Sequence, residues 1–96
     1  MNPLTLVIDC LPNEGNKDQA ISTLKALGPK IKAEEGCLTF DILVSEDKNS
    51  YMIYETWSSE ALWQAHLQSD HMKDFSPFIH KLFKVFDVKR YGHVNE

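Results

Sequence analysis

The chain has few of the residues on which several classes of protein depend. Its 96 residues include 2 cysteines, 4 prolines and 4 glycines. Two cysteines cannot build a disulfide framework, so a small secreted fold held by disulfides is excluded, and free thiols suit a reducing compartment. The low glycine and proline content, together with 43% hydrophobic and 25% charged residues, excludes collagen-like and disordered chains.

Long hydrophobic runs and an excess of basic charge are also missing. No apolar stretch approaches the roughly 20 residues that cross a bilayer, and the first residues, Met1 to Leu4, lack the basic start of a signal peptide. The formal net charge is −4, the opposite of the basic surface that binds nucleic-acid phosphates. We therefore expect a cytoplasmic protein with no membrane and no nucleic-acid partner.

Aromatic residues, in contrast, are plentiful for the size of the chain. The length of the chain predicts a single domain over residues 1–96. A domain this small buries only about 60–65% of the surface that its unfolded chain exposes. The chain nevertheless carries 2 Trp, 3 Tyr and 5 Phe. We expect part of this aromatic surface to be covered by a partner and part to line a pocket.

Alternation of side chains predicts four strands. They cover residues 4–10, 37–44, 51–57 and 85–91. The polar residues 45–50 favour a hairpin between the second and third strands. The third strand carries large side chains on both faces, which is typical of a sheet with both faces covered.

Apolar residues at a spacing of three and four predict the helices. The first begins at Asn16 and continues to about residue 34, and Gly36 is predicted to follow it in a left-handed conformation. The second helical region begins at Ser58 or Ser59 and reaches about residue 68. New helical segments are predicted to begin at Ser69-Asp70, where either residue can cap a helix, and at Ser76-Pro77, where the proline occupies the first helical position.

The order β-α-β-β-α-β indicates a ferredoxin-like α+β fold. In this fold an antiparallel four-stranded sheet carries both helical regions on one face. The opposite face still holds apolar and aromatic side chains, which a second copy of the chain can cover. We therefore predict a homodimer, for which twofold symmetry is the default.

Three stretches of the chain match a known family pattern. They are residues 35–38 (E-G-C-L), residues 54–57 (Y-E-T-W) and residues 65–72 (A-H-L-Q-S-D-H-M), with Phe75 just beyond. They resemble the antibiotic biosynthesis monooxygenase family, which carries E-x-G-C/x, a strand ending in E-x-W, and a helix with A-H-x-x-S/T-x-H. The resemblance implies a dimeric α+β barrel made of two ferredoxin-like units, each with a pocket between its helices and its sheet.

The same resemblance implies an enzyme that works without a cofactor. Quinol monooxygenases of this family oxidise a quinol or another small dihydroxy-aromatic compound directly with O2. Such a reaction needs a base to deprotonate the phenol and a dry apolar pocket to protect the intermediates. His66 is the candidate base, because histidine is the side chain that can ordinarily exchange a proton near neutral pH. The candidate substrate-binding residues are Trp57, Glu55, Phe40, Tyr54, His71 and Phe75.

Each of these residues also has a purely structural interpretation. His66 could be a buried histidine bonded to a backbone carbonyl or to Glu55, and the aromatic residues could belong to the core. Glu55 is costly to bury alone, so we expect a histidine or a backbone amide beside it. His71 follows His66 by five positions, about 140° around a continuous helix, and shares its face only if the helix breaks at Ser69-Asp70.

Sequence spacing predicts neither a metal nor a nucleotide site. The four histidines form no H-x₃-H pair, and the two cysteines lie far apart in the chain. No G-x-G-x-x-G or Walker pattern occurs.

Three other functions remain open at this point. One is a non-catalytic dimer that binds a small hydrophobic ligand in the same pocket. Another is an isomerase of a phosphorylated signalling sugar, whose pattern is similar to Glu34-Glu35-Gly36 and Tyr54-Glu55. Haem degradation is disfavoured, because the Asn, Trp and His of the haem-degrading relatives are not matched here.

Overall fold

The computed structural model describes residues 2–94. The elements follow the predicted β-α-β-β-α-β order, with the second helical region divided into short pieces. In chain order they are β1 (Leu4–Pro12), α1 (Lys17–Lys32), β2 (Cys37–Val44), β3 (Tyr51–Trp57), α2 (Glu60–Leu67), α3 (Asp70–Phe75), the 3₁₀ turn η1 (Ser76–Phe78), α4 (Ile79–Leu82) and β4 (Phe83–Tyr91).

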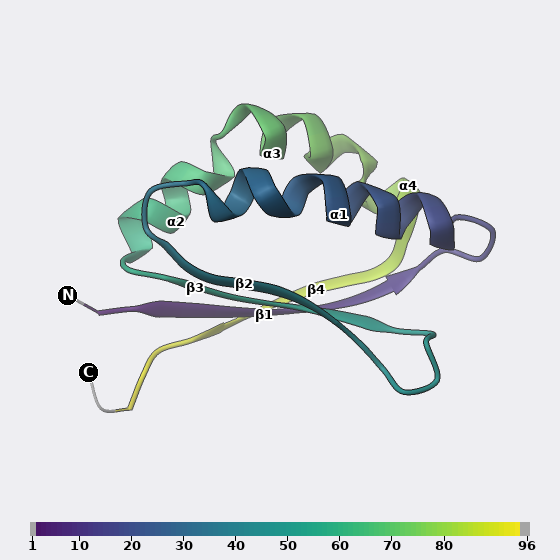
Figure 1. Cartoon of the computed structure of the whole chain (residues 1–96), viewed down its shortest axis with the longest axis horizontal. Helices are drawn as coiled ribbons and strands as arrows, with labels where there is room; N and C mark the ends of the chain where they lie inside the picture. The colour runs from purple at the N-terminus through teal and green to yellow at the C-terminus, as the bar shows by residue number, and fades with distance from the viewer. Residues whose placement is uncertain (1, 95–96) are drawn as a thin grey trace.

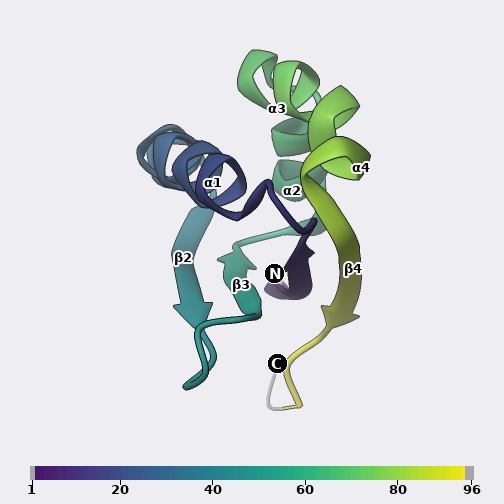
Figure 2. The same ribbon diagram turned by 90° about the vertical axis from the view of Figure 1, so that its right-hand side faces the viewer.

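The four strands form one antiparallel sheet in the order β2-β3-β1-β4. All helices lie on one face of this sheet (Figure 1). Figure 2 shows α1 on the β2 side of the sheet, and α3 and α4 toward the β4 side. The predicted ferredoxin-like α+β fold is therefore confirmed.

The core lies between the helices and the sheet. This follows from the spacing of apolar residues, which is every second residue in the strands and every third or fourth residue in the helices. Every second residue of β1 faces the helices, and α1 turns one apolar stripe toward the strands. The buried residues that form this core include Leu4, Leu6, Ile8, Cys10, Ala20, Leu24, Leu27, Ile31, Phe40, Ile53 and Trp57.

Two boundaries differ from the predicted ones. β1 extends to Pro12 and β4 begins at Phe83, because these residues pair across the sheet after a register shift at Leu11. Helix α1 ends at Lys32, earlier than predicted, although it continues through Pro29. Gly36 has φ +88°, so the predicted left-handed residue lies in the turn between α1 and β2.

The predicted break in the second helical region is confirmed. Ser59 caps α2 by accepting a hydrogen bond from the backbone N–H of Leu62, and Ser69 caps α3 in the same way from Met72. Because α2 and α3 each begin at their own capping serine, they are separate helices, and the chain changes direction at Ser69. This change of direction determines where His71 lies.

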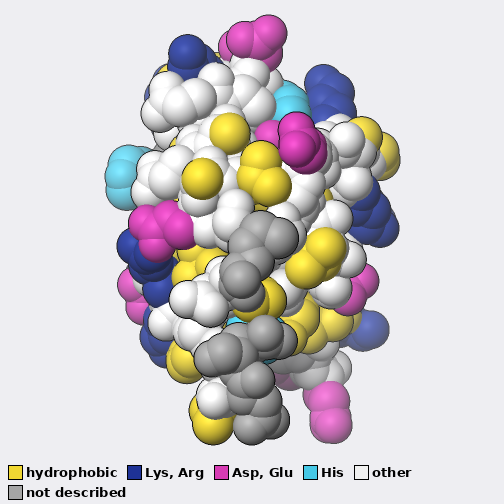
Figure 3. All heavy atoms as spheres, turned by 90° about the vertical axis from the view of Figure 1, so that its left-hand side faces the viewer, with side chains coloured by type: hydrophobic (Ala, Val, Ile, Leu, Met, Phe, Trp, Pro, Cys, Tyr) yellow, Lys and Arg dark blue, Asp and Glu magenta, His cyan; other side chains and the backbone are white. Residues whose placement is uncertain are grey.

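The sheet face opposite the helices is partly apolar. Register with β1 and β3 places Leu43, Tyr54, Val85 and Tyr91 on this outer face, and each of them is exposed. At the end of the molecule seen in Figure 3, acidic and basic side chains are interspersed with hydrophobic ones. Within residues 2–94, no helix combines the length and hydrophobicity needed to cross a membrane.

Candidate functional site

A cavity of about 300 Å³ lies between the sheet and the helices. Its walls are mainly apolar and come from both layers, including Leu24, Ile31, Phe40, Ile53, Phe75 and Phe86. Four polar side chains also line it, namely Glu55, His66, Ser76 and His80. Glu55 and His66 are buried, whereas Ser76 and His80 are exposed.

His66 is the buried histidine of this cavity. It projects from α2 and is only 3% exposed. Its Nδ1 lies 2.6 Å from Oε2 of Glu34, and its ring centroid lies 4.6 Å from that of Trp57. An ionised carboxylate can only accept hydrogen bonds, so Nδ1 is the donor of this pair.

The other ring nitrogen of His66, Nε2, makes no hydrogen bond to a described residue. No enclosed side-chain nitrogen or oxygen within residues 2–94 lacks a partner, so Nε2 must border open space. His66 lines the cavity, and we infer that Nε2 is the ring nitrogen that borders it. An unprotonated imidazole nitrogen in an apolar cavity can act as a base.

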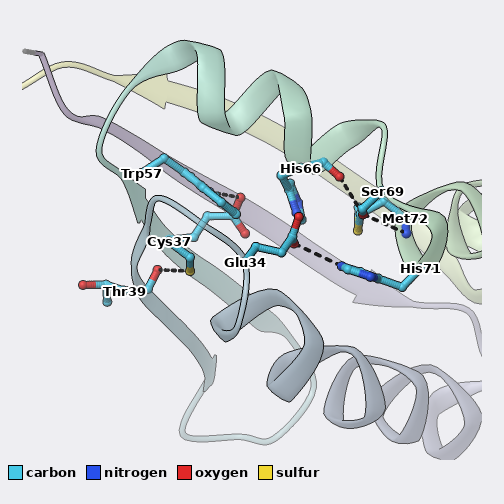
Figure 4. A network of polar contacts seen from close by, with 9 residues as sticks. Glu34, Cys37, Thr39, Trp57, His66, Ser69, His71 and Met72 are labelled. Carbon is cyan, nitrogen blue, oxygen red and sulfur yellow. Dashed lines mark hydrogen bonds and ion pairs between the residues drawn. The ribbon is translucent and has the colours of Figure 1, made fainter.

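Glu34 links two histidines through one oxygen atom. It lies in the turn after α1, and its Oε2 is 2.6 Å from Nδ1 of His66 and 3.0 Å from Nε2 of His71 (Figure 4). Sequence reasoning noted Glu34 only in a comparison with isomerases and did not assign it to this site. The histidines lie 32 and 37 residues away along the chain, so no local spacing reveals the contact.

His71 reaches the cluster from outside the cavity. It lies in the first turn of α3, and the break at Ser69 brings it to the same carboxylate as His66. The side chain does not line the cavity but borders a groove between α1 and α3. The break predicted at Ser69-Asp70 therefore brings both histidines to one carboxylate, but His71, expected as a substrate-binding residue, is not among the residues that line the cavity.

Glu55 is paired with a partner that the sequence did not indicate. The indole Nε1 of Trp57 donates to Oε1 of Glu55 over 3.0 Å, in place of the expected histidine or backbone amide. Burial raises the pKa of the Glu55 carboxyl above its ordinary value of 4.5, whereas the Trp57 hydrogen bond and nearby His66 lower it. Trp57 is fully buried and supports His66 and Glu55 from behind the cavity wall.

Replacing Glu55 with glutamine is expected to stabilise the fold at neutral pH. Between pH 4.5 and the raised pKa, Glu55 keeps its proton in the folded protein and loses it in the unfolded protein. The free energy of unfolding therefore falls as the pH rises through this range. Glutamine keeps an acceptor for Trp57 and removes the buried charge. We expect a gain on the order of 1 kcal/mol at pH 8, or about 4–8 °C, and little difference at pH 4. Thermal unfolding at both pH values tests this, and a larger loss of stability at pH 8 than at pH 4 would contradict it.

The remaining predicted residues differ in whether they line the cavity. Phe40 and Phe75 line the cavity, as expected for pocket walls. Tyr54 alternates to the outer face of β3, opposite Val7 and Asp41, and does not line the cavity. The motif that contains Tyr54 does not distinguish the two faces of the strand, whereas its two-residue alternation does.

One group of described residues could hold a metal ion. The ligand atoms of Glu34, His66 and His71 all lie within 4.8 Å of one another. Two imidazoles and a carboxylate suit several divalent transition metals. The same three groups also satisfy one another by hydrogen bonds, so the cluster is equally suited to hold a proton.

Comparison with known proteins adds a family and a set of similar folds. The family model described as "Antibiotic biosynthesis monooxygenase" matches residues 3–77. The structure of Rv0793 from Mycobacterium tuberculosis superposes with a TM-score of 0.92 at 20% identity, covering 98% of this chain and 97% of that one. A conserved protein from Bacteroides thetaiotaomicron, described as "Possible Oxidoreductase", superposes with a TM-score of 0.87 at 26% identity. The match covers 96% of this chain and 98% of that one.

Curated relatives match a smaller part of the chain. N-terminal EF-hand calcium-binding protein 1 of Mus musculus is 36% identical over 52 residues, and that of Homo sapiens is 35% identical over the same length. The matched region makes up 54% of this chain and 15% of either relative. These relatives are therefore much longer proteins that share one region with this chain.

Proposed function

Because the chain belongs to the antibiotic biosynthesis monooxygenase family, we propose that it oxidises a quinol or another small dihydroxy-aromatic compound with O2 and without a cofactor. One observation carries the proposal above all others. The buried His66 has its Nδ1 bonded to Glu34, and the residue lines an apolar cavity.

The first step of the proposed reaction is proton transfer. A phenolic O–H of the substrate donates to Nε2 of His66, and the imidazole takes the proton. Glu34 stabilises the imidazolium from the other side of the ring, as a buried carboxylate does behind a catalytic histidine. Glu55 lies on the same cavity wall and can accept a hydrogen bond from the second hydroxyl group.

The second step is electron transfer from the phenolate to O2, which the apolar wall protects from water. The oxygen then bonds to a ring carbon, and the O–O bond breaks. In the balanced reaction the substrate loses two hydrogen atoms and gains one oxygen atom, giving a hydroxyquinone, and the second oxygen atom leaves as water. The proton held by His66 returns to the departing hydroxide.

Cavity size and lining define the substrate class. A volume of about 300 Å³ lies at the lower end of small-molecule pockets and suits one or two aromatic rings. Lysine and arginine are absent from the described lining residues, so the cavity offers no fixed positive charge to a phosphate group. This lining favours a dihydroxy-aromatic substrate over a phosphorylated sugar.

Oxygen uptake tests the proposal. Purified protein, treated with EDTA, is given a panel of benzo- and naphthohydroquinones in an oxygen electrode. We expect uptake above the autoxidation rate, and no change on EDTA treatment. Binding of the compounds without uptake would identify a ligand-binding protein instead, and uptake that EDTA abolishes and a metal restores would contradict the cofactor-free mechanism.

The functional unit is proposed to be a homodimer in the cytoplasm. The exposed apolar residues on the outer sheet face, Tyr54 and Val85 among them, would be covered by sheet-on-sheet packing with a second copy. Free thiols at Cys10 and Cys37 are consistent with a reducing compartment. Sedimentation is expected to give about twice the 11.0 kDa chain mass, and a monomer at all concentrations would exclude the dimer.

A further inference from the structure

The reactivity of His66 depends on which of its nitrogens carries the proton. A neutral imidazole has one donor and one acceptor, and the hydrogen bond made by one nitrogen decides the role of the other. In this protein Glu34 contacts Nδ1, and Nε2 borders the cavity. Only the tautomer with hydrogen on Nδ1 leaves a free acceptor facing the substrate.

Glu34 is itself held by a second donor. Nε2 of His71 lies 3.0 Å from the same Oε2 atom that contacts His66. Glu34 and His71 are 16% and 17% exposed, whereas His66 is 3% exposed. The carboxylate therefore lies between the buried site and the surface, where it could turn toward water if nothing held it in place.

We propose that Glu34 and His71 are positioning residues that set the tautomer and orientation of His66. Glu34 acts directly by accepting from Nδ1, and His71 acts through Glu34 by fixing its carboxylate. The catalytic consequence rests on the proposed monooxygenase function, whereas the assignment of the tautomer does not. His71 thus takes the role of a support for the base, outside the substrate cavity.

Other charged groups near His66 do not provide this control. The groups near it are Glu34 from the turn after α1, His71 from α3 and Glu55 from β3. His80 of α4 lines the same cavity but has no hydrogen bond to His66. Glu55 makes its hydrogen bond to Trp57 and none to His66. Glu34 is therefore the partner that determines the position of the ring proton.

The two positioning residues should differ in the size of their effect. Loss of Glu34 removes the acceptor for Nδ1, so the proton is expected to move to Nε2 and block the base. Loss of His71 leaves the acceptor in place but free to rotate, so a mixture of tautomers is expected. Glutamine at position 71 supplies an N–H donor to the carboxylate and should restore the original state.

Nitrogen NMR of the imidazole rings tests the proposal without substrate. Long-range ¹H–¹⁵N spectra of the full chain at pH 8 report which nitrogen of His66 is protonated. We expect hydrogen on Nδ1 in the unmodified protein and in His71→Gln, a mixture in His71→Ala, and mainly Nε2 in Glu34→Ala. His93→Ala removes an exposed histidine that is not among the cavity-lining residues and should leave His66 unchanged.

The proposal is overturned if His66 carries its proton on Nε2, or on both nitrogens, in the unmodified protein. It is also overturned if His71→Ala leaves the tautomer unchanged, and this variant serves even where Glu34→Ala does not fold. With hydroquinone as substrate, His71→Ala should lower kcat about 10-fold with KM unchanged, and His71→Gln should recover most of the loss. Expected tautomers without oxygen uptake would reject the enzyme function alone, and uptake with tautomers insensitive to both substitutions would reject the positioning role alone.

Discussion

Replacing His66 with glutamine is expected to lower kcat for hydroquinone oxidation by about 100- to 10,000-fold, the range typical of a lost general base. Glutamine has nearly the length of histidine and retains an amide that can hydrogen-bond Glu34, so the cavity wall should survive. It has no group that accepts a proton at neutral pH. The measurement is steady-state oxygen uptake, with circular dichroism to show that the fold is intact.

His93→Gln is the matched control for this substitution. His93 is exposed, is not among the residues that line the cavity, and has its Nε2 2.8 Å from Oγ1 of Thr5. Its replacement should change kcat by no more than a small factor. If His66→Gln were as active as the unmodified protein, the base would have to be another group, and the proposed mechanism would be wrong.

Replacing Gly36 with alanine is expected to destabilise the fold by about 2–4 kcal/mol. The residue has φ +88°, which costs alanine roughly 1 kcal/mol or more. An added Cβ would also lie 2.7 Å from Cβ of Leu62 on α2, a clash that requires a shift of the backbone and adds about 1–3 kcal/mol. A domain of this size typically has only about 5–15 kcal/mol of stability, so the loss is a large part of it.

Gly15→Ala separates the two parts of this cost. Gly15 has nearly the same φ, +87°, but nothing lies within 4 Å of an added Cβ. Its replacement should therefore cost only the strain, roughly 1 kcal/mol. Urea unfolding of both variants measures the difference. Equal losses at the two positions would show that Leu62 yields easily and that the close packing of the turn against α2 is unimportant.

Gly36 also matters for the site, because Glu34 lies two residues before it in the same turn. A shift of this turn would move the Glu34 carboxylate away from His66 and His71. The conformation that only glycine adopts easily is thus part of what positions Glu34 beside His66.

Much of the fold could be predicted because it depends on local periodicity. Alternation predicts the strand cores, and capping serines predict the starts of α2 and α3. The ends of β1 and β4 were missed, because Pro12 and Phe83 are added by pairing with each other, a contact between distant parts of the chain.

The candidate site could be predicted only in part, for the same reason. His66 was identified, because it carries recognisable chemistry on a helix in a family motif. Glu34 was not, because its role comes from contacts with histidines 32 and 37 residues away. Tyr54 was included through the motif that contains it, although the alternation of β3 directs it to the outer face.

The proposed function depends on direct transfer of one oxygen atom from O2 to an aromatic substrate in the His66 cavity. The most direct measurement is mass spectrometry of the product formed under ¹⁸O2 by EDTA-treated protein from a reactive hydroquinone. We predict a hydroxyquinone that contains one ¹⁸O atom, with the other in water, and almost none of this product with His66→Gln. Formation of the simple quinone with release of hydrogen peroxide, or ¹⁸O incorporation unaffected by His66→Gln, would contradict the account.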